Sequence, residues 1–179
     1  ILEISVTVGE NTEMLTTEEN TNVLQTNYTT TQTGNITFTI TGTDAEGKTY
    51  TDSNTIYVKG PDVDKDIPEG LLEGINYLDE NTVGLVFRAP HNQSIYVLGD
   101  FNNWELNEDF HMYRDSIFDE DKNHINTLFW CTFDVEDPTK KYAFQYLVDG
   151  EKKISDPYST VVLDPWNDKY IKASLLDSS

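Results

Sequence analysis

The sequence predicts an all-β protein built as two antiparallel β-sandwiches in tandem. Apolar residues alternate with polar ones along most of the chain, which is the period-2 pattern of strands. No segment shows a convincing helical period. Aromatic residues make up 12% of the chain, and flat or branched side chains favour strands. A length of 179 residues accommodates one large domain or two small ones.

The first 60 residues are expected to contain strands and nothing else. In Asn35–Thr43, Ile36, Phe38 and Ile40 share one face and threonines fill the other. Threonine suits the wet face of a sheet because it is β-branched and polar. Five one-sided strands make half of a sandwich, so we expect the missing strands upstream of Ile1. The expected strands are Ile1–Val8, Thr12–Thr17, Val23–Thr30, Asn35–Thr43 and Lys48–Lys59.

Residues 61–70 are expected to be a linker, and 71–179 a second sandwich. Two prolines, several acids and a glycine favour an extended path over a core element. Thr127–Val135 is apolar on both faces, which predicts a central, covered strand. The turn Asp149-Gly150 predicts a hairpin. The expected strands are Gly74–Leu78, Thr82–Ala89, Ser94–Phe101, Phe110–Arg114, Thr127–Val135, Lys141–Val148 and Lys169–Leu175.

The charge balance excludes several classes of partner. The net charge of −20, from 32 acidic and 12 basic residues, argues against nucleic acid and against an anionic membrane surface. No apolar run reaches the about 20 residues that cross a bilayer, so no membrane insertion is expected. A neutral polymer such as a polysaccharide remains compatible, and solubility alone would also explain the charge.

Catalysis is not expected from this chain. Glycoside hydrolysis needs two carboxylates facing each other in a cleft, and acids on sandwich loops supply none. The histidines lack metal-ligand spacing, and Asp119-Glu120-Asp121 reads as a solvated loop rather than a calcium site. Cys131 is the only cysteine and is expected to be a buried thiol. We therefore expect no catalytic residues, no metal and no cofactor.

The stretch Ile95–Trp104 organises the second unit. A strand ends at Gly99-Asp100, where glycine permits unusual backbone angles. Asn102 and Asn103 can hydrogen-bond to the local backbone. Trp104 then either packs into a core or domain contact, or is presented to a ligand.

Three motifs in this order resemble a known module. They are Gly99-Asp100-Phe101-Asn102-Asn103-Trp104, Tyr146-Leu147-Val148-Asp149-Gly150 and Asp156-Pro157-Tyr158. They resemble the isoamylase-type early-set β-sandwich, which is grouped with the glycogen-binding carbohydrate-binding modules of family 48. With Gly74-Ile75-Asn76-Tyr77 at the start and Leu163–Ile171 at the end, the second unit is also similar to the region before the catalytic barrel in α-amylase-family enzymes (glycoside hydrolase family 13) of Bacteroides-type bacteria. There an immunoglobulin-like domain often precedes the early-set module, as residues 1–60 would here.

The resemblance implies an α-glucan site, which we transfer residue by residue. Trp104 matches the family's loop tryptophan, with Asn103 beside it. Gln145 stands where the family has lysine, and Lys152 stands where it has a second tryptophan. Asn167 matches an asparagine before the last strand, and Trp166 beside it could restore part of the lost stacking.

Two functional hypotheses follow from the resemblance. In the first, the chain is a non-catalytic accessory region that holds starch or maltooligosaccharide near a C-terminal catalytic domain of the same chain, absent here; this predicts an exposed Trp104 with polar neighbours. In the second, it is a structural or protein-interaction spacer; this predicts Trp104 or Trp166 in a bare apolar patch. Either reading implies a bacterial protein that is secreted, periplasmic or at the cell surface.

Overall fold

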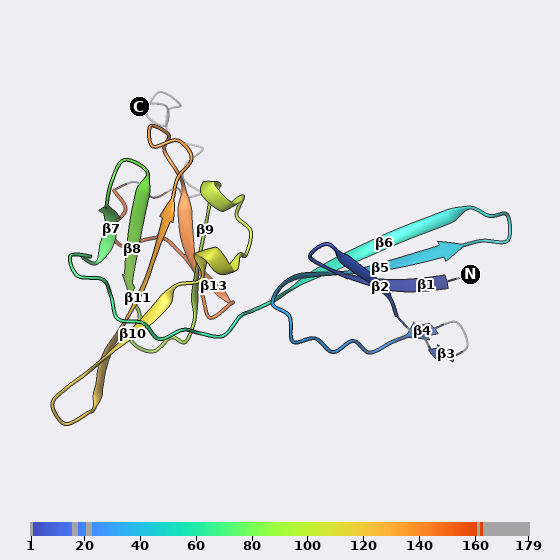
Figure 1. The fold of residues 1–179 in the computed structure, drawn as a ribbon, viewed down its shortest axis with the longest axis horizontal. Helices are drawn as coiled ribbons and strands as arrows, with labels where there is room; N and C mark the ends of the chain where they lie inside the picture. Colours follow the sequence, from blue (N-terminus) through green and yellow to red (C-terminus); the bar gives the residue numbers. More distant parts are fainter. Residues whose placement is uncertain (1, 16–17, 21–22, 161, 163–179) are drawn as a thin grey trace. The chain divides into compact units, whose positions relative to one another are not determined.

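The computed structural model describes residues 2–15, 18–20, 23–160 and 162. The protein is all-β, with antiparallel sheets and only two short 3₁₀ turns among these residues (Figure 1). Unit 1 comprises Ile1–Asp62 with Leu106–Asp109, and unit 2 comprises Val63–Glu105 with Phe110–Ser179. The division falls inside the stretch 61–70, and the strand pattern gave no sign of the short addition at 106–109.

Unit 1 is built on one four-stranded antiparallel sheet in the order β2-β1-β5-β6. A separate two-stranded hairpin pairs β3 with β4. Neighbouring strands β5 and β6 pair over their whole length without a register shift. The strands are β1 (Leu2–Val8), β2 (Asn11–Met14), β3 (Glu18–Asn20), β4 (Val23–Gln25), β5 (Gly34–Thr43) and β6 (Thr49–Val58).

The two faces of the unit 1 sheet differ as the alternation predicts. Ile4, Val6 and Ile36 are buried on the apolar face, where the ring of Tyr28 meets Phe38 edge-on at 5.8 Å. The strand expected at Val23–Thr30 is shorter than predicted, since β4 ends at Gln25. The following residues have no strand partner, and Tyr28 instead covers the apolar face.

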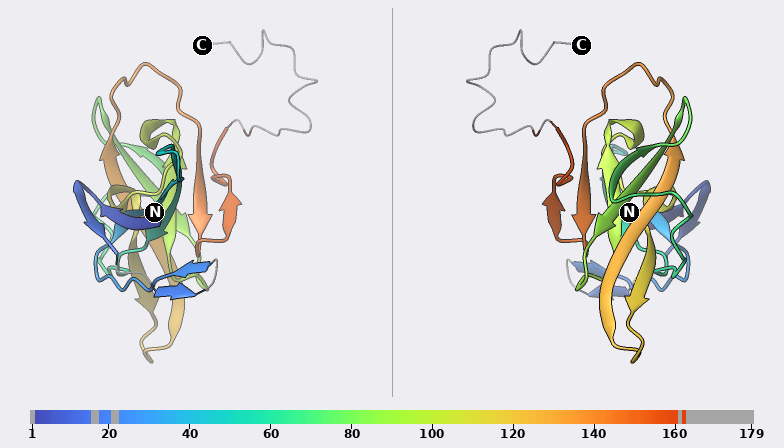
Figure 2. Two further views of the ribbon diagram at one scale, coloured as in Figure 1. Left: turned by 90° about the vertical axis from the view of Figure 1, so that its right-hand side faces the viewer. Right: turned by 90° about the vertical axis from the view of Figure 1, so that its left-hand side faces the viewer.

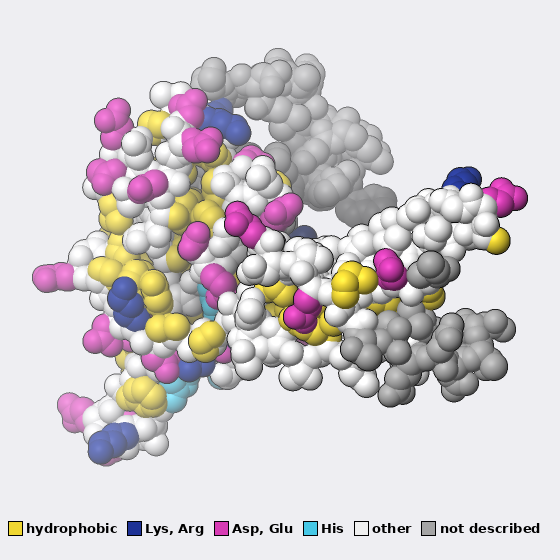
Figure 3. Space-filling model, turned by 45° about the vertical axis from the view of Figure 1, so that its right-hand side comes forward, with side chains coloured by type: hydrophobic (Ala, Val, Ile, Leu, Met, Phe, Trp, Pro, Cys, Tyr) yellow, Lys and Arg dark blue, Asp and Glu magenta, His cyan; other side chains and the backbone are white. Residues whose placement is uncertain are grey.

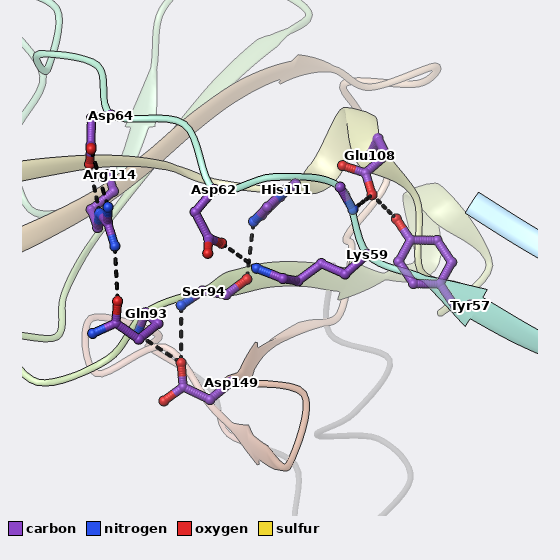
Figure 4. Close-up of polar contacts among 11 residues, drawn as sticks. Tyr57, Lys59, Asp62, Asp64, Gln93, Ser94, Glu108, His111, Arg114 and Asp149 are labelled. Carbon is purple, nitrogen blue, oxygen red and sulfur yellow. Dashed lines mark hydrogen bonds and ion pairs between the residues drawn. The ribbon is translucent and has the colours of Figure 1, made fainter. Parts of the chain in front are cut away.

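The end of β6 is fastened by a carboxylate within unit 1. Glu108 lies in the turn η2 (Glu108–Phe110). Its Oε1 accepts hydrogen bonds from the Tyr57 hydroxyl at 2.6 Å and from the Gly60 backbone N–H at 2.8 Å (Figure 4). A charged acceptor makes such bonds stronger than neutral ones.

Unit 2 is a two-sheet sandwich. One sheet has the order β10-β11-β8-β7 and the other the order β13-β12-β9. Both contribute to one core, in which Phe129 and Tyr146 are fully buried and the rings of Phe87 and Tyr146 stack at 4.5 Å. The strands are β7 (Gly74–Tyr77), β8 (Thr82–Arg88), β9 (Ile95–Gly99), β10 (Tyr113–Phe118), β11 (His124–Asp134), β12 (Phe144–Val148) and β13 (Lys152–Ile154).

The strands β10 and β11 form a longer hairpin than the sequence predicts, and the hairpin projects from the sandwich (Figures 1 and 2). The strand expected at Phe110–Arg114 begins instead at Tyr113 and runs to Phe118. The acidic run expected in a long loop forms the hairpin turn, where Asp119 Oδ1 accepts the N–H of Asn123 at 2.7 Å. Such side-chain bonds replace ladder bonds at a turn.

The stretch after Asp62 is extended, as expected of a linker, but its backbone is paired. Arg114 donates its N–H to the Val63 carbonyl and Lys65 donates to the Arg114 carbonyl, both at 2.9 Å. The indole of Trp130 donates to the Lys65 carbonyl at 2.9 Å. These partners come from β10 and β11, some 50 or more residues later in the chain, so local sequence gives no sign of them.

Acidic side chains are spread over the face that Figure 3 displays, with few lysines and arginines among them. This agrees with the net charge of −20. In the described part of the chain, no helix is long and apolar enough to cross a membrane.

Candidate functional site

The loop after β9 is built by side chains that bond to the backbone. The Asn102 side chain accepts the Gly99 N–H at 2.8 Å and donates to the Val97 carbonyl at 2.9 Å. Asp100 bonds to Ala143 twice: Oδ2 accepts the Ala143 N–H at 2.9 Å, and its own N–H donates to the Ala143 carbonyl at 3.0 Å. The loop is therefore tied at its root to the start of β12.

Gly99 is required for space rather than for an unusual backbone angle. Its backbone is fully extended, with φ −167° and ψ −177°. A Cβ there would lie 2.7 Å from the Ala143 carbonyl oxygen and 2.7 Å from the Phe101 ring. The sequence-based reason for this glycine was therefore wrong, because the close approach of β12 and Phe101 excludes any side chain.

The left-handed residues of the loop are Asn103 and Trp104, with φ of 54° and 61°. Asparagine tolerates this region, whereas a bulky residue such as tryptophan rarely adopts it. Backbone strain of this kind concentrates at binding and catalytic sites. Trp104 therefore combines a strained backbone with an exposed side chain.

Trp104 is held as an exposed ring. Its side chain is 40% exposed, its indole Nε1 donates to Asp100 Oδ1 at 2.9 Å, and its N–H donates to the Gly99 carbonyl at 2.9 Å. The Ala143 N–H, the Trp104 indole and the Lys140 ammonium together hold the pKa of Asp100 below its usual value. The carboxylate is thus ionised near neutral pH and fixes the orientation of the ring.

The same loop sends a second aromatic ring inward. Phe101 lies 4.5 Å from Phe133 and 5.2 Å from Phe110, measured between ring centroids. These rings pack against the main core. Phe101 therefore anchors the loop, and the polar bonds of Asp100 direct Trp104 outward.

Gln145 and Lys152 occupy different faces and different ends of their sheet. Gln145 lies opposite Leu98, on the face away from the Tyr146 and Val148 core residues. Lys152 lies opposite Val148, and directly paired residues share a face. Val148 lies at the far end of β12 from the loop, roughly 13 Å along the strand at about 3.3 Å per residue.

Gln145 lies near the root of the Trp104 loop, because its pairing partner Leu98 directly precedes Gly99. Lys152 belongs to the opposite end. Asn103 is exposed beside Trp104. Trp166 and Asn167, together with the expected strand Lys169–Leu175, lie outside the described residues.

The hairpin turn Asp149-Gly150 is confirmed. Both residues are left-handed, with φ of 50° and 72°, and Glu151 donates its N–H to the Val148 carbonyl at 3.0 Å. This is the two-residue turn that Asp-Gly favours. The Asp149 carboxylate also accepts the N–H groups of Gln93 and Ser94, at 2.8 and 3.0 Å (Figure 4).

Ser94 and His111 form a serine–histidine contact that resembles a nucleophile and its base. The Ser94 hydroxyl and His111 Nε2 are 3.0 Å apart (Figure 4). Ser94 is only 5% exposed, and His111 stacks on the buried Tyr96 at 4.2 Å. The contact fastens the start of β9 to the residues just before β10. The Ser94 hydroxyl is too deeply buried for a substrate to reach it.

The remaining residues that the sequence singled out are structural. Trp130 is buried, under the Lys65 ammonium at 5.0 Å from its ring. Cys131 is buried, and burial raises the pKa of its thiol to about 12, so it is not a nucleophile. The Tyr158 ring lies against Gly74, where a Cβ would be 2.8 Å from Cγ of the ring.

Asp156 is a buried carboxylate with a structural role. It is 2% exposed and accepts the Tyr146 hydroxyl and the Tyr158 N–H, both at 2.6 Å. Burial raises the pKa of the Tyr146 hydroxyl, and the hydrogen bond to the Asp156 carboxylate raises it further. The Asp-Pro motif therefore fastens the returning segment to the core.

Sequence reasoning missed three residues around the Trp104 loop. Asp100 was read only as part of a turn, although its carboxylate holds the indole. Tyr142 and Lys140 were not considered, and the Lys140 ammonium lies 5.1 Å from the Tyr142 ring centroid. The four-residue spacing of Asp100 and Trp104 was the available signal for the first.

No protein-family model matches the chain, and no curated protein matches it. Among the residues that the structure describes, no group of three or more His, Cys, Asp or Glu side chains is placed to hold a metal ion. The case for a function therefore rests on the geometry of the Trp104 loop.

Proposed function

We propose that this chain is a non-catalytic accessory region of an α-amylase-type glycoside hydrolase, and that unit 2 binds α-glucan through Trp104. The supporting observation is the exposed, left-handed Trp104, whose indole is fixed by the Asp100 carboxylate. Polar neighbours around an exposed ring are what the binding hypothesis predicts. The resemblance of the three motifs to those of glycogen-binding modules is the reason for proposing α-glucan as the ligand.

The chemistry of the loop suits a sugar ring. The flat indole offers an apolar face to the C–H groups of a pyranose, and aromatic contacts of this kind need little conformational adjustment. The side chains of Asn103 and Gln145 carry amides that can donate and accept hydrogen bonds with hydroxyls. A pre-fixed ring loses little entropy on binding. The parent protein would then act outside the cytoplasm, where starch is met.

Calorimetric titration with maltoheptaose and β-cyclodextrin tests this function. We expect saturable heat from the unmodified protein, and its loss in Trp104→Ala. The matched control is Tyr77→Ala, because Tyr77 is an aromatic of the same unit that is 81% exposed; it should bind as before. No heat at millimolar ligand from a folded protein would remove the binding function.

A structural role has its own supporting observation. Leu72, Tyr77 and Leu78 are all exposed, at or beside the edge strand β7. Exposed apolar groups of this size often mark a contact with another domain or protein. In this second candidate, unit 2 positions a catalytic domain and unit 1 is a spacer. In a longer chain that contains the barrel, Leu72→Ser with Tyr77→Ser should then speed proteolysis between the domains, and an unchanged cleavage rate would count against it.

A further inference from the structure

The loop before β12 lies next to the Trp104 loop at the same end of the sandwich. Both oxygens of the Asp100 carboxylate are used, Oδ1 by the Trp104 indole and Oδ2 by the Ala143 N–H. Ala143 directly follows Tyr142 in the chain, and the Tyr142 ring centroid is 6.2 Å from that of Phe101. Asp100 therefore has Trp104 on one side and the chain of Tyr142 on the other.

The Tyr142 side chain, like that of Trp104, makes a hydrogen bond within its own loop. Its hydroxyl accepts the Asp137 N–H at 3.1 Å, and its ring is partly exposed. Asp137 Oδ1 also accepts the N–H and hydroxyl of Thr139, at 2.9 and 2.6 Å. The loop 137–142 is thus closed on itself by short local bonds, and it fixes the ring in one orientation.

Lys140 completes this cluster. Its ammonium lies 5.1 Å from the Tyr142 ring centroid, and its charge contributes to the lowered pKa of Asp100. An ammonium has three donors for hydroxyl oxygens. The cluster combines two partly exposed aromatic rings, one carboxylate and one ammonium, drawn from two loops.

We propose that Tyr142 and Lys140 form a second subsite that extends the Trp104 site, so that the module reads at least two neighbouring glucose units of an α-glucan. This subsite rests on the proposed function of Trp104. It supplies, from a different loop, the second aromatic that Lys152 does not provide. Lys152 is paired to the far end of β12, whereas Ala143 touches the root of the Trp104 loop.

Titrations with a long glucan and with a single glucose unit distinguish the two subsites. We expect Tyr142→Ala to bind maltoheptaose roughly three- to tenfold more weakly, the size of one aromatic contact, and to bind methyl α-glucoside as the unmodified protein does. Lys140→Ala should show the same selectivity with a smaller effect. Trp104→Ala should lose both ligands, and Tyr77→Ala should change neither.

Amide chemical shifts of the unmodified protein provide a readout that needs no variant. We expect maltoheptaose to shift the amides of residues 139–143 as well as 100–104, and methyl α-glucoside, a single glucose unit, to shift the amides of 100–104 only. Equal affinities of Tyr142→Ala and unmodified protein for maltoheptaose, or unshifted amides at 139–143, would overturn the second subsite and leave the Trp104 function standing. An unmodified protein that binds neither maltoheptaose nor methyl α-glucoside would overturn both.

Discussion

The strands of both units alternate apolar and polar residues, but the two units bury their apolar side chains to different extents. Unit 2 encloses its apolar residues between two sheets, and its largest core side chains, Phe129 and Tyr146, are fully buried. Unit 1 has one main sheet, on which Ile36 is buried while Ile40 and Ile56 on the same face remain exposed. An alternating pattern thus specifies a one-sided sheet, and a second layer decides how much free energy the sheet gains from burial.

The two units also differ in what their polar side chains bond to. The polar face of unit 1 carries threonines whose hydroxyls bond to one another, as in the pair Thr37–Thr55 at 2.8 Å. In unit 2 the polar bonds instead position particular side chains, as Asp100 positions Trp104. The proposed binding site therefore lies in unit 2, where the surrounding structure holds the strained backbone of Trp104.

The largest expected effect is on the core of unit 2. Phe129→Ala should lower the free energy of unfolding of this unit by about 3–5 kcal/mol, because it removes a fully buried ring and leaves a cavity. Urea unfolding followed by tryptophan fluorescence measures it selectively, since unit 1 contains no tryptophan. Phe118→Ala is the control on the same sheet; its side chain is 57% exposed, so a change within about 0.5 kcal/mol is expected. Equal effects of the two would contradict the assigned core.

A smaller effect is expected from the buried hydroxyl of Tyr146. Tyr146→Phe leaves the buried Asp156 carboxylate without one of its donors, which should cost about 1–3 kcal/mol. The same unfolding experiment applies. Tyr158→Phe is the matched control, because its hydroxyl meets Glu73 at an exposed site, 3.3 Å away; a loss as large as that of Tyr146→Phe would show that Asp156 is not the fastening point.

Acid should release Trp104 from Asp100. The loss of stability should be smaller than for the two core substitutions, because Asp100 lies at an exposed position. Its pKa is lowered in the folded protein, so its contribution to stability is complete above the unfolded-state pKa and is lost as the pH falls through the folded-state value. The indole N–H resonance of Trp104 should therefore titrate below pH 3.8, the unperturbed value. Asp100→Asn should remove this titration, and a midpoint above that value would contradict the proposed role of the carboxylate.

The smallest effect is expected on the polar face of unit 1. Thr37→Val and Thr39→Val each remove an exposed hydroxyl pair but keep the β-branched shape that strands favour. We expect changes within about 0.5 kcal/mol in the free energy of unfolding, measured by circular dichroism. A loss above about 1 kcal/mol would show that the hydroxyl network, and not the apolar face, stabilises this sheet.

Local patterns predicted most strands of the fold, and long-range partners explain where they failed. The alternation in Asn35–Thr43 and the Asp149-Gly150 turn are properties of adjacent residues, and the structure has both. The extension of β10 to Phe118 depends on pairing with β11, which no local window contains. The packing of residues 63–67 depends on Arg114 and Trp130 in the same way.

The candidate site shows the same division. The sequence by itself determined that the chain is all-β and that an aromatic residue ends the turn after Gly99, because both follow from side-chain period and turn chemistry over a few residues. Only the tertiary structure decided that Trp104 is exposed, that Asp100 is bonded to Ala143 and that Tyr142 lies beside Phe101 of the same loop. These depend on β9 and β12 lying side by side, and a strand's neighbours are chosen by the burial of both sheets together rather than by any one stretch of sequence.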